Sequence, residues 1–266
     1  MLGCVIGDLA GSIYEYSQIK KISPISVTNL IEENSFFSDD TILMVAVLDA
    51  ILNNKSYEES LKYWAKKYLN YLPDHKPYFK GMFSPGFTNW VNGDFAGTSM
   101  GNGCMMRIAP VGYLFNDEKE VVRQTRLATI PSHNTEESIK NASIVSLIIF
   151  YARQGLTKEE IIKKLKLKIN KPQIDKFNYT VLDTIDVCLY SLFNSNSFEN
   201  AIKLSLSFGG DSDTNACIVG GMAEAVYGVD EKLKMQALKK IPDEFKDLIL
   251  KGYERLSGSE NIIRQK

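Results

Sequence analysis

The chain has 266 residues, of which 44% are hydrophobic and 24% charged, and its net charge is -1 at pH 7. This balance gives no basic surface for nucleic acid, and the longest uninterrupted apolar run, residues 42–48, is far too short to span a membrane. The N-terminal stretch MLGCVIGDLAGS has no basic region, which is unlike a signal peptide. The four cysteines are scattered without a CxxC pair, so we expect reduced thiols, no zinc site and a cytoplasmic protein.

Helix signals dominate the chain from beginning to end. Residues 42–52 form an apolar segment, and capping-box spacings predict helices that start after Ser56, Asp117 and Thr157. Apolar residues then recur at helical intervals after each of these starts. Periodicity and terminal signals predict further helices over residues 136–153, 180–193, 198–207, 231–239 and 243–256.

Strand signals are nearly absent, and only residues 25–30 have a weak β-like bias. Two segments rich in Gly, Pro and aromatic residues, 73–97 and 97–110, are expected to be long loops. No linker or internal repeat divides the chain. We therefore predict one all-α domain over residues 1–266, with its function in the loops between helices.

The acidic pair Asp39-Asp40 follows Ser38 directly before the apolar residues 42–52. In one interpretation Ser38 caps a helix and the two acids complement its dipole. In the other, the helix is central and buried, and its acidic end lies in a pocket. Adjacent carboxylates in a buried place need a partner of opposite charge, and the apolar segment favours this second interpretation.

A second acidic motif, GGDSDT, occupies residues 209–214 and precedes a run of small residues. Asp211 or Asp213 would cap a helix in the simpler interpretation. However, paired acids beside a hydroxyl residue now occur twice, and four converging carboxylates repel one another unless cations neutralise them. Carboxylate and hydroxyl ligands without His or Cys favour Mg²⁺ or Mn²⁺ over zinc. We predict a divalent metal site, with capping as the alternative.

Three further motifs are less specific. Residues 3–15 contain three glycines, which suit either close helix packing or close approach to a ligand. Gly101-Asn102-Gly103 is either an anion-binding nest or a plain turn. His133 lies in a polar cluster before the 136–153 helix. Its side chain either caps that helix or points toward a ligand.

Five motifs in this order resemble the ADP-ribosylglycohydrolase family, which includes the dinitrogenase-reductase-activating glycohydrolases and the ADP-ribosyl-acceptor hydrolases. The motifs are GxxxGDxxGSxYE, SDDT, GNGxxMRxxPVG, SHN and GGDSDT, and they run from residue 3 to about residue 228. The resemblance implies a compact, all-α, largely orthogonal multi-helix bundle around a binuclear metal site. That site would hold two Mg²⁺ ions, or Mn²⁺ in their place.

The same resemblance gives a role to each candidate residue. The implied metal ligands, among which Asp213 bridges the two ions, are Ser38, Asp39, Asp40, Asp211, Asp213 and Thr214. The implied catalytic residues are Glu15, Asp40 and Asp211, and the sequence leaves open whether Glu15 or a metal-bound acid is the general base. The implied substrate-binding residues are Gly101, Asn102 and Gly103 over the pyrophosphate and ribose, with Ser132, His133 and Asn134 on the ADP-ribose side.

The expected function is hydrolysis of the ribose glycosidic bond of an ADP-ribosylated target, above all ADP-ribosyl-arginine on protein. Cations would hold the ribose hydroxyls and lower the pKa of an attacking water, while Glu15 acts as acid or base. The partner is an ADP-ribosylated protein or an ADP-ribose-containing small molecule, and we expect a monomer with no membrane or nucleic-acid partner. The alternatives are a non-catalytic ADP-ribose-binding relative, a hydrolase of O-acetyl-ADP-ribose or another ADP-ribosyl linkage, and a metal-dependent hydrolase of a phosphoester or nucleotide.

Acceptor specificity is expected in the 73–97 loop. Its aromatic side chains either bind the substrate or belong to the core: Tyr78, Phe79, Phe83, Phe87 and Trp90.

Overall fold

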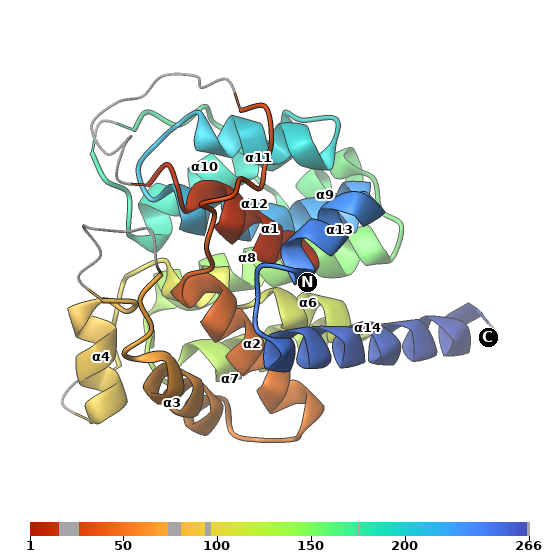
Figure 1. Cartoon of the computed structure of the whole chain (residues 1–266). Helices are drawn as coiled ribbons and strands as arrows, with labels where there is room; N and C mark the ends of the chain where they lie inside the picture. The colour runs from red at the N-terminus through yellow and green to blue at the C-terminus, as the bar shows by residue number, and fades with distance from the viewer. Residues whose placement is uncertain (16–26, 74–80, 94–96, 175, 265–266) are drawn as a thin grey trace.

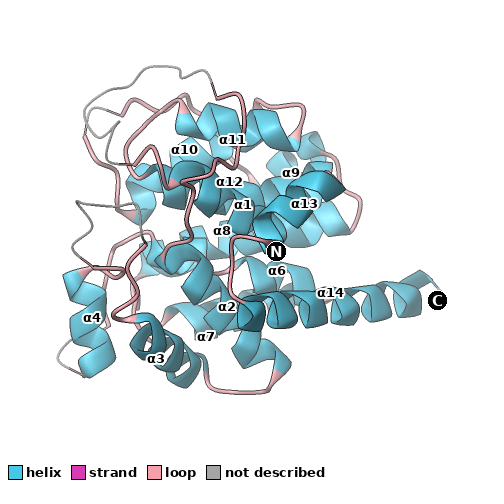
Figure 2. Ribbon diagram, viewed as in Figure 1, coloured by secondary structure: helices cyan, strands magenta, loops and turns pink. Residues whose placement is uncertain are grey.

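The computed structural model describes residues 1–15, 27–73, 81–93, 97–174 and 176–264. These residues form fourteen helices and no strand, and their only β-type pairing is two isolated bridges (Figure 2). The predicted all-α class is therefore confirmed.

The first seven helices are α1 (Leu2–Gly11), α2 (Asp39–Leu52), α3 (Tyr57–Tyr68), α4 (Pro85–Asn92), α5 (Gly103–Met106), α6 (Ala109–Leu114) and α7 (Glu118–Thr129). The remaining seven are α8 (Glu136–Arg153), α9 (Lys158–Leu165), α10 (Val181–Phe193), α11 (Phe198–Leu206), α12 (Ser212–Tyr227), α13 (Glu231–Leu238) and α14 (Asp243–Arg264).

The helix starts predicted from capping spacings are confirmed. The side chains of Ser56, Asp117 and Thr157 each accept a hydrogen bond from the backbone N–H three residues further on. The helices predicted from periodicity also occur, and α14 continues past its predicted end to Arg264. Residues 27–30 of the segment with a weak β-like bias contain no strand, and residues 25–26 lie outside the described part.

The two segments expected to be long loops are more helical than predicted. Helix α4 lies within the first, where Ser84 caps it and Pro85 occupies its first turn. Helix α5, with only four residues, and the start of α6 lie within the second. Helices this short lack the apolar repeat from which periodicity predicts a helix.

Helices α1 and α12 pack with their backbones almost in contact, side by side in Figure 1. A Cβ atom on Gly7 would lie 1.9 Å from the carbonyl oxygen of Ala216, and one on Gly3 would lie 2.1 Å from that of Gly220. Gly11 faces Asp213 equally closely. Because no larger side chain fits, close helix packing is the role of this glycine motif.

Helix α2 lies at the centre of the molecule, and every residue from Asp40 to Ile51 is buried. It contacts α1, α3, α6, α12 and α14, with α14 extending beside it to the C-terminal end (Figure 1). Ser38 caps α2, because its side chain accepts the backbone N–H of Asp40. Both interpretations of the first acidic motif therefore hold together: the helix is capped, and it is central and buried.

None of the helices in the described residues is both long and apolar enough to cross a membrane. The four cysteines are all free and buried.

Candidate active site

A cavity of about 970 Å³ opens where the N-terminal ends of α2 and α12 meet the residues that follow α1. The three helices contact one another, so acids from opposite halves of the chain converge there. The acidic side chains that line the cavity are Glu15, Asp39, Asp211 and Asp213, and the hydroxyl residues Ser38 and Thr214 lie beside them in the sequence motifs.

Asp8 on α1 is fully buried and holds the start of α2 in place. Its Oδ2 accepts the backbone N–H groups of Ser38 at 2.9 Å and Thr41 at 3.1 Å, and the Thr41 hydroxyl at 2.5 Å. Asp8 is not among the site residues predicted from the sequence. The signal that could have found it is that Asp8 is the only charged residue of α1.

Asp40 is buried, and the two oxygens of its carboxylate have different surroundings. Its Oδ2 lies 3.0 Å from Ser38 Oγ and 3.1 Å from Thr214 Oγ1, whereas its Oδ1 has no hydrogen-bond partner among the described residues. Ser38 Oγ also lies 2.8 Å from Asp8 Oδ1. One hydroxyl proton cannot serve both carboxylates, so this cluster takes up a further proton or a cation.

Asp211 precedes α12, but its side chain does not cap that helix, so the capping alternative is wrong for this side chain. The chain turns through Gly209 and Gly210, whose φ angles of 70° and 73° lie in the left-handed region. This turn directs Asp211 into the cavity, where its Oδ2 accepts a hydrogen bond from Asn102 Nδ2 at 2.7 Å.

Two groups of three carboxyls are each compact enough to hold a cation. In each group one oxygen from every residue lies within 4.8 Å of the others. The groups, which share Asp213, are Asp8, Asp40 and Asp213, and Glu15, Asp211 and Asp213. The all-oxygen ligand set and the buried, unpartnered Asp40 Oδ1 fit a hard divalent cation such as Mg²⁺ or Mn²⁺.

The electrostatics of the cavity point the same way. Burial raises the pKa of Asp39, Asp40 and Asp211 well above the ordinary value, and the charge of Asp213 raises each further. Burial, with a contribution from Asp213, also raises the pKa of Asp8 to about 7, against hydrogen bonds that lower it. Carboxyls in such surroundings favour a proton or a cation, and a bound cation would reverse these shifts. Asp39 lines the cavity without belonging to either group of three.

The loop before α5 forms another part of the wall. Isolated β-bridges join this loop to His133 and to Thr180. Gly101 and Asn102 line the cavity, while Gly103, the first residue of α5, faces the imidazole ring of His133. The structure therefore brings this glycine motif close to His133, and Asn102 to Asp211.

The backbone amides of this loop are largely used within the protein. Gly101 N–H donates to Ser99 Oγ at 3.1 Å, and Asn102 N–H donates to the carbonyl oxygen of Tyr179 at 2.8 Å. The loop therefore does not present the open anion-binding nest that was one interpretation of the motif. An anion bound here would need side-chain donors or the N–H of Gly103.

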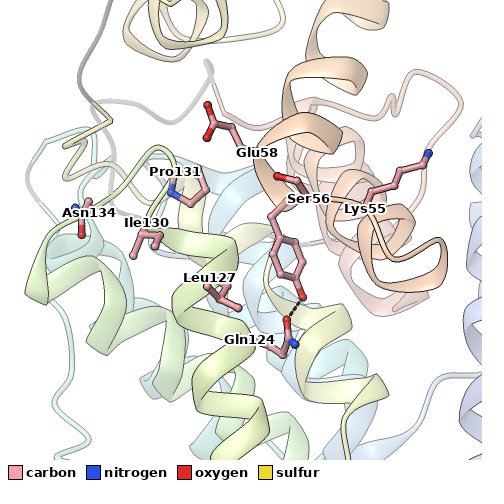
Figure 3. Close-up of a pocket in the computed structure, with 9 residues that line it drawn as sticks. Lys55, Ser56, Glu58, Gln124, Leu127, Ile130, Pro131 and Asn134 are labelled. Carbon is pink, nitrogen blue, oxygen red and sulfur yellow. Dashed lines mark hydrogen bonds between the residues drawn. The ribbon is translucent and has the colours of Figure 1, made fainter.

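The consecutive residues Ser132, His133 and Asn134 face two different cavities. Ser132 and His133 are buried and line the acidic cavity. Asn134 is exposed and lines a separate cavity of about 520 Å³ between the start of α3 and α7, where Tyr57 donates a hydrogen bond to Gln124 (Figure 3). The structure thus brings two of these three candidates to the site and leaves Asn134 outside it.

His133 does not cap α8, because the side chain of Thr135 does. Burial lowers the pKa of His133 well below its ordinary value, and the nearby positive charge of Arg107 lowers it further. The imidazole is therefore neutral at neutral pH.

Aromatic rings form the remaining wall. Phe83, Phe87 and Trp90 line the cavity, and adjacent ring centroids in this series lie 5.5 and 5.3 Å apart. Phe83 and Trp90 are also part of the buried core, so the core interpretation is confirmed for these two rings, and substrate binding by them stays a prediction. Tyr78 and Phe79 lie outside the described residues. Two aromatic residues that the sequence analysis did not single out line the same cavity: Phe177 and Tyr179.

The fold and the site define an all-α protein with a cluster of carboxylates, able to hold a cation, at the N-terminal ends of α2 and α12. The sequence profile of the ADP-ribosylglycohydrolase family matches residues 1–261, and the chain belongs to this family of hydrolytic enzymes. The resemblance carried by the five motifs is confirmed.

Relatives of known name share this assignment at low identity. The ADP-ribosylarginine hydrolase Tri1 of Pseudomonas putida is 23% identical, over 86% of this chain and 70% of its own length. The ADP-ribosylhydrolase ARH3 of Danio rerio is 23% identical, over 96% of this chain and 89% of its own length. A solved structure, "ADP-ribosylglycohydrolase-related protein complex", matches the fold with a TM-score of 0.66 at 15% identity, over 96% of this chain and 95% of its own.

Proposed function

We propose that this protein hydrolyses the bond between ribose and the acceptor in ADP-ribosylated targets, and that it does so with two divalent cations, Mg²⁺ or Mn²⁺. The observation that carries the proposal is the two clusters of three carboxyls, which share Asp213, beside a cavity of about 970 Å³. A cavity of this size suits a ligand as large as ADP-ribose. Membership of the family supports the reaction class.

The residues that would hold the cations come from three helices and the segments before them. The proposed ligands are Asp8, Ser38, Asp39, Asp40, Asp211, Asp213 and Thr214. Bound there, the cations would orient the ribose hydroxyls and lower the pKa of a water molecule.

Glu15 is the proposed proton-transfer group. It is partly exposed, lines the cavity and lies close to Asp211 and Asp213, both of which are buried. When water adds to the anomeric carbon and the bond to the acceptor breaks, Glu15 takes the proton that the water loses and returns it to the leaving acceptor. Buried Asp40 and Asp211 are better placed to hold cations than to exchange protons with solvent.

Arginine is the proposed acceptor. The carboxyls of the site are Asp8, Glu15, Asp39, Asp40, Asp211 and Asp213. If all are ionised, they carry more negative charge than two divalent cations would neutralise. The remaining negative charge favours a cationic guanidinium over a neutral serine or an acetyl ester. One relative, Tri1, carries the name ADP-ribosylarginine hydrolase.

An assay of ADP-ribose release tests this proposal with three substrates: ADP-ribosyl-arginine, serine-linked ADP-ribose and O-acetyl-ADP-ribose. We expect the arginine linkage to be cleaved fastest, and cleavage to stop when a chelator removes the cations. Faster cleavage of a neutral linkage would overturn the assignment of arginine. Tight binding of ADP-ribose with no turnover of any linkage would overturn the hydrolase itself.

A further inference from the structure

Arg107 is a fully buried cation for which no carboxylate partner occurs among the described residues. Burial lowers its pKa to about 10, which leaves it charged at neutral pH. One terminal nitrogen donates to the carbonyl oxygen of Ala128 at 3.0 Å and to Ser132 Oγ at 2.7 Å. Its Nε and other terminal nitrogen have no partner among the described residues. Arg107 does not itself line the acidic cavity.

Ser132 connects Arg107 to His133. Its Oγ accepts the hydrogen bond from Arg107 and lies 2.8 Å from His133 Nδ1. The serine hydroxyl has one proton, and no other acceptor for it occurs among the described residues. If Nδ1 carried a proton, that hydroxyl proton would be buried without a partner, which costs free energy. The hydroxyl therefore donates to Nδ1, and Nδ1 accepts.

This direction fixes the protonation of the imidazole. With Nδ1 as an acceptor, the single proton of the neutral ring is on Nε2. The Nε2 side of the ring faces the loop before α5 and the start of that helix, since Nε2 would lie 3.8 Å from a Cβ atom on Gly101 and 3.5 Å from one on Gly103. His133 also lines the cavity, so its Nε2–H is directed to the place where this loop borders the ligand space.

We propose that Arg107 and Ser132 hold His133 as the neutral Nε2–H tautomer, and that this N–H donates to the diphosphate of the bound ligand. Arg107 and Ser132 act as positioning residues. The backbone amides of Gly101 and Asn102 are occupied by protein acceptors, so a side-chain donor is needed at this part of the wall. The assignment of the diphosphate rests on the proposed function, whereas the tautomer does not.

The tautomer is directly measurable because the chain has only two histidines. In protein labelled with ¹⁵N at histidine, a protonated and an unprotonated ring nitrogen resonate far apart, and their couplings to the ring protons identify Nδ1 and Nε2. His75→Gln removes the other set of signals. We expect His133 to show an unprotonated Nδ1 and a protonated Nε2 at neutral pH. A proton on Nδ1, or a charged ring, would overturn the proposal.

Titration with ligands tests the contact. We expect ADP-ribose to shift the Nε2 signal of His133, and adenosine, which lacks the diphosphate, to leave it unchanged. An equal shift with both ligands would show that the contact is not to the diphosphate and would overturn that part of the proposal.

Ser132→Ala and Ser132→Thr form a matched pair, since only the second keeps the hydroxyl. We expect Ser132→Ala to give a mixture of tautomers and to raise KM about tenfold with little change in kcat, as loss of an oriented hydrogen bond to a charged ligand would do. Ser132→Thr should restore the single tautomer. Unchanged tautomer and KM in Ser132→Ala would overturn the relay, and the spectrum of the unsubstituted protein decides the tautomer even if a variant fails to fold.

The two proposals fail in different ways. Hydrolysis of ADP-ribosyl-arginine by a protein whose His133 carries its proton on Nδ1 would overturn the relay alone. An Nε2–H tautomer in a protein that hydrolyses no ADP-ribosyl linkage would overturn the proposed function alone.

Discussion

Two buried aspartates of α2 show how position decides what a carboxylate does. Asp40, at the N-terminal end, has a buried oxygen without a partner among the described residues, and burial raises its pKa. Asp49 lies near the other end, where burial also acts to raise its pKa. Its hydrogen bonds, of which that from Lys55 has the largest effect, outweigh burial, and the pKa of Asp49 is lowered. The Nε1–H of Trp64 donates to the same carboxylate at 2.9 Å. Asp49 is thus satisfied by the protein, whereas Asp40 keeps one buried oxygen that a cation could bind.

Asp213→Asn tests the proposed cation site, because Asp213 belongs to both clusters of three carboxyls. We expect Mg²⁺ affinity to fall by about 100-fold or more, beyond the loss typical of residues that merely support a metal ligand. In chelator, the same variant should melt at a higher temperature than the unsubstituted protein, since a repelling charge is gone. Titration calorimetry and thermal melting measure the two effects.

Asp49→Asn is the matched control, since it changes a buried aspartate of α2 that the protein itself satisfies. We expect it to lose about 1–3 kcal/mol of stability and to keep its Mg²⁺ affinity. Equal Mg²⁺ affinity in Asp213→Asn and Asp49→Asn would remove the reason for placing cations beside Asp213.

The stability of the cation-free protein should depend on pH through Asp8. Its pKa rises from 3.8 to about 7 on folding, so between these values the folded state binds more protons than the unfolded state. Stability is therefore greatest below about pH 4 as far as this group is concerned, and falls as pH rises toward about 7, by up to about 1.4 kcal/mol per pH unit. Melting temperatures in chelator across this range test the sign, and added Mg²⁺ should flatten the dependence. A melting temperature that rises through the range contradicts the shift.

At the scale of elements, the crossing of α1 and α12 sets the geometry of the site. The glycines of α1 let Asp8 approach the end of α12 that carries Asp213. The sequence offered close packing as one interpretation of these glycines, but periodicity within α1 does not identify its partner. The partner lies about two hundred residues away, with Ser212 Oγ donating to the carbonyl oxygen of Gly11.

Gly7→Ala tests this crossing, because its Cβ would lie 1.9 Å from the carbonyl oxygen of Ala216. We expect a loss of about 1–3 kcal/mol of stability from overpacking, together with weaker Mg²⁺ binding as Asp8 moves from Asp213. Gly258→Ala on α14 is the control, since a Cβ there meets no atom within 4 Å. It should stabilise the protein by about 0.5–1 kcal/mol, the ordinary gain for this change in a helix. Urea unfolding of both variants gives the comparison, and equal stabilities would show that the crossing tolerates a side chain.

Sequence patterns predicted most elements because their start signals are local. The helix caps at Ser56, Asp117 and Thr157 can be recognised from neighbouring residues alone. The acidic motifs at the starts of α2 and α12 can be recognised in the same way. Asp8 was missed because its partners at the start of α2 are distant in sequence. The direction of Asn134 could not be predicted either, since adjacent residues of a turn face opposite ways and no periodic pattern governs them.

For the whole molecule, cation binding should appear as stability. Cations that bind the folded state alone stabilise it by about 2.7 kcal/mol for one site at 100 times the dissociation constant. We expect the melting temperature to rise with Mg²⁺ concentration, and ADP-ribose to raise it further if it occupies the same cavity. A melting temperature unaffected by Mg²⁺ or Mn²⁺ would leave the acidic cavity without its proposed ligand.

The pairing of α1 with α12 also has a consequence for biosynthesis. A ribosome delivers α1 long before α12, whose first residue is 201 positions beyond the last residue of α1. Asp8 can meet its partners at the start of α2 early in synthesis, but the face of α1 that packs against α12 has no native partner until then. The carboxylate clusters that share Asp213 therefore cannot form before the start of α12 has been made.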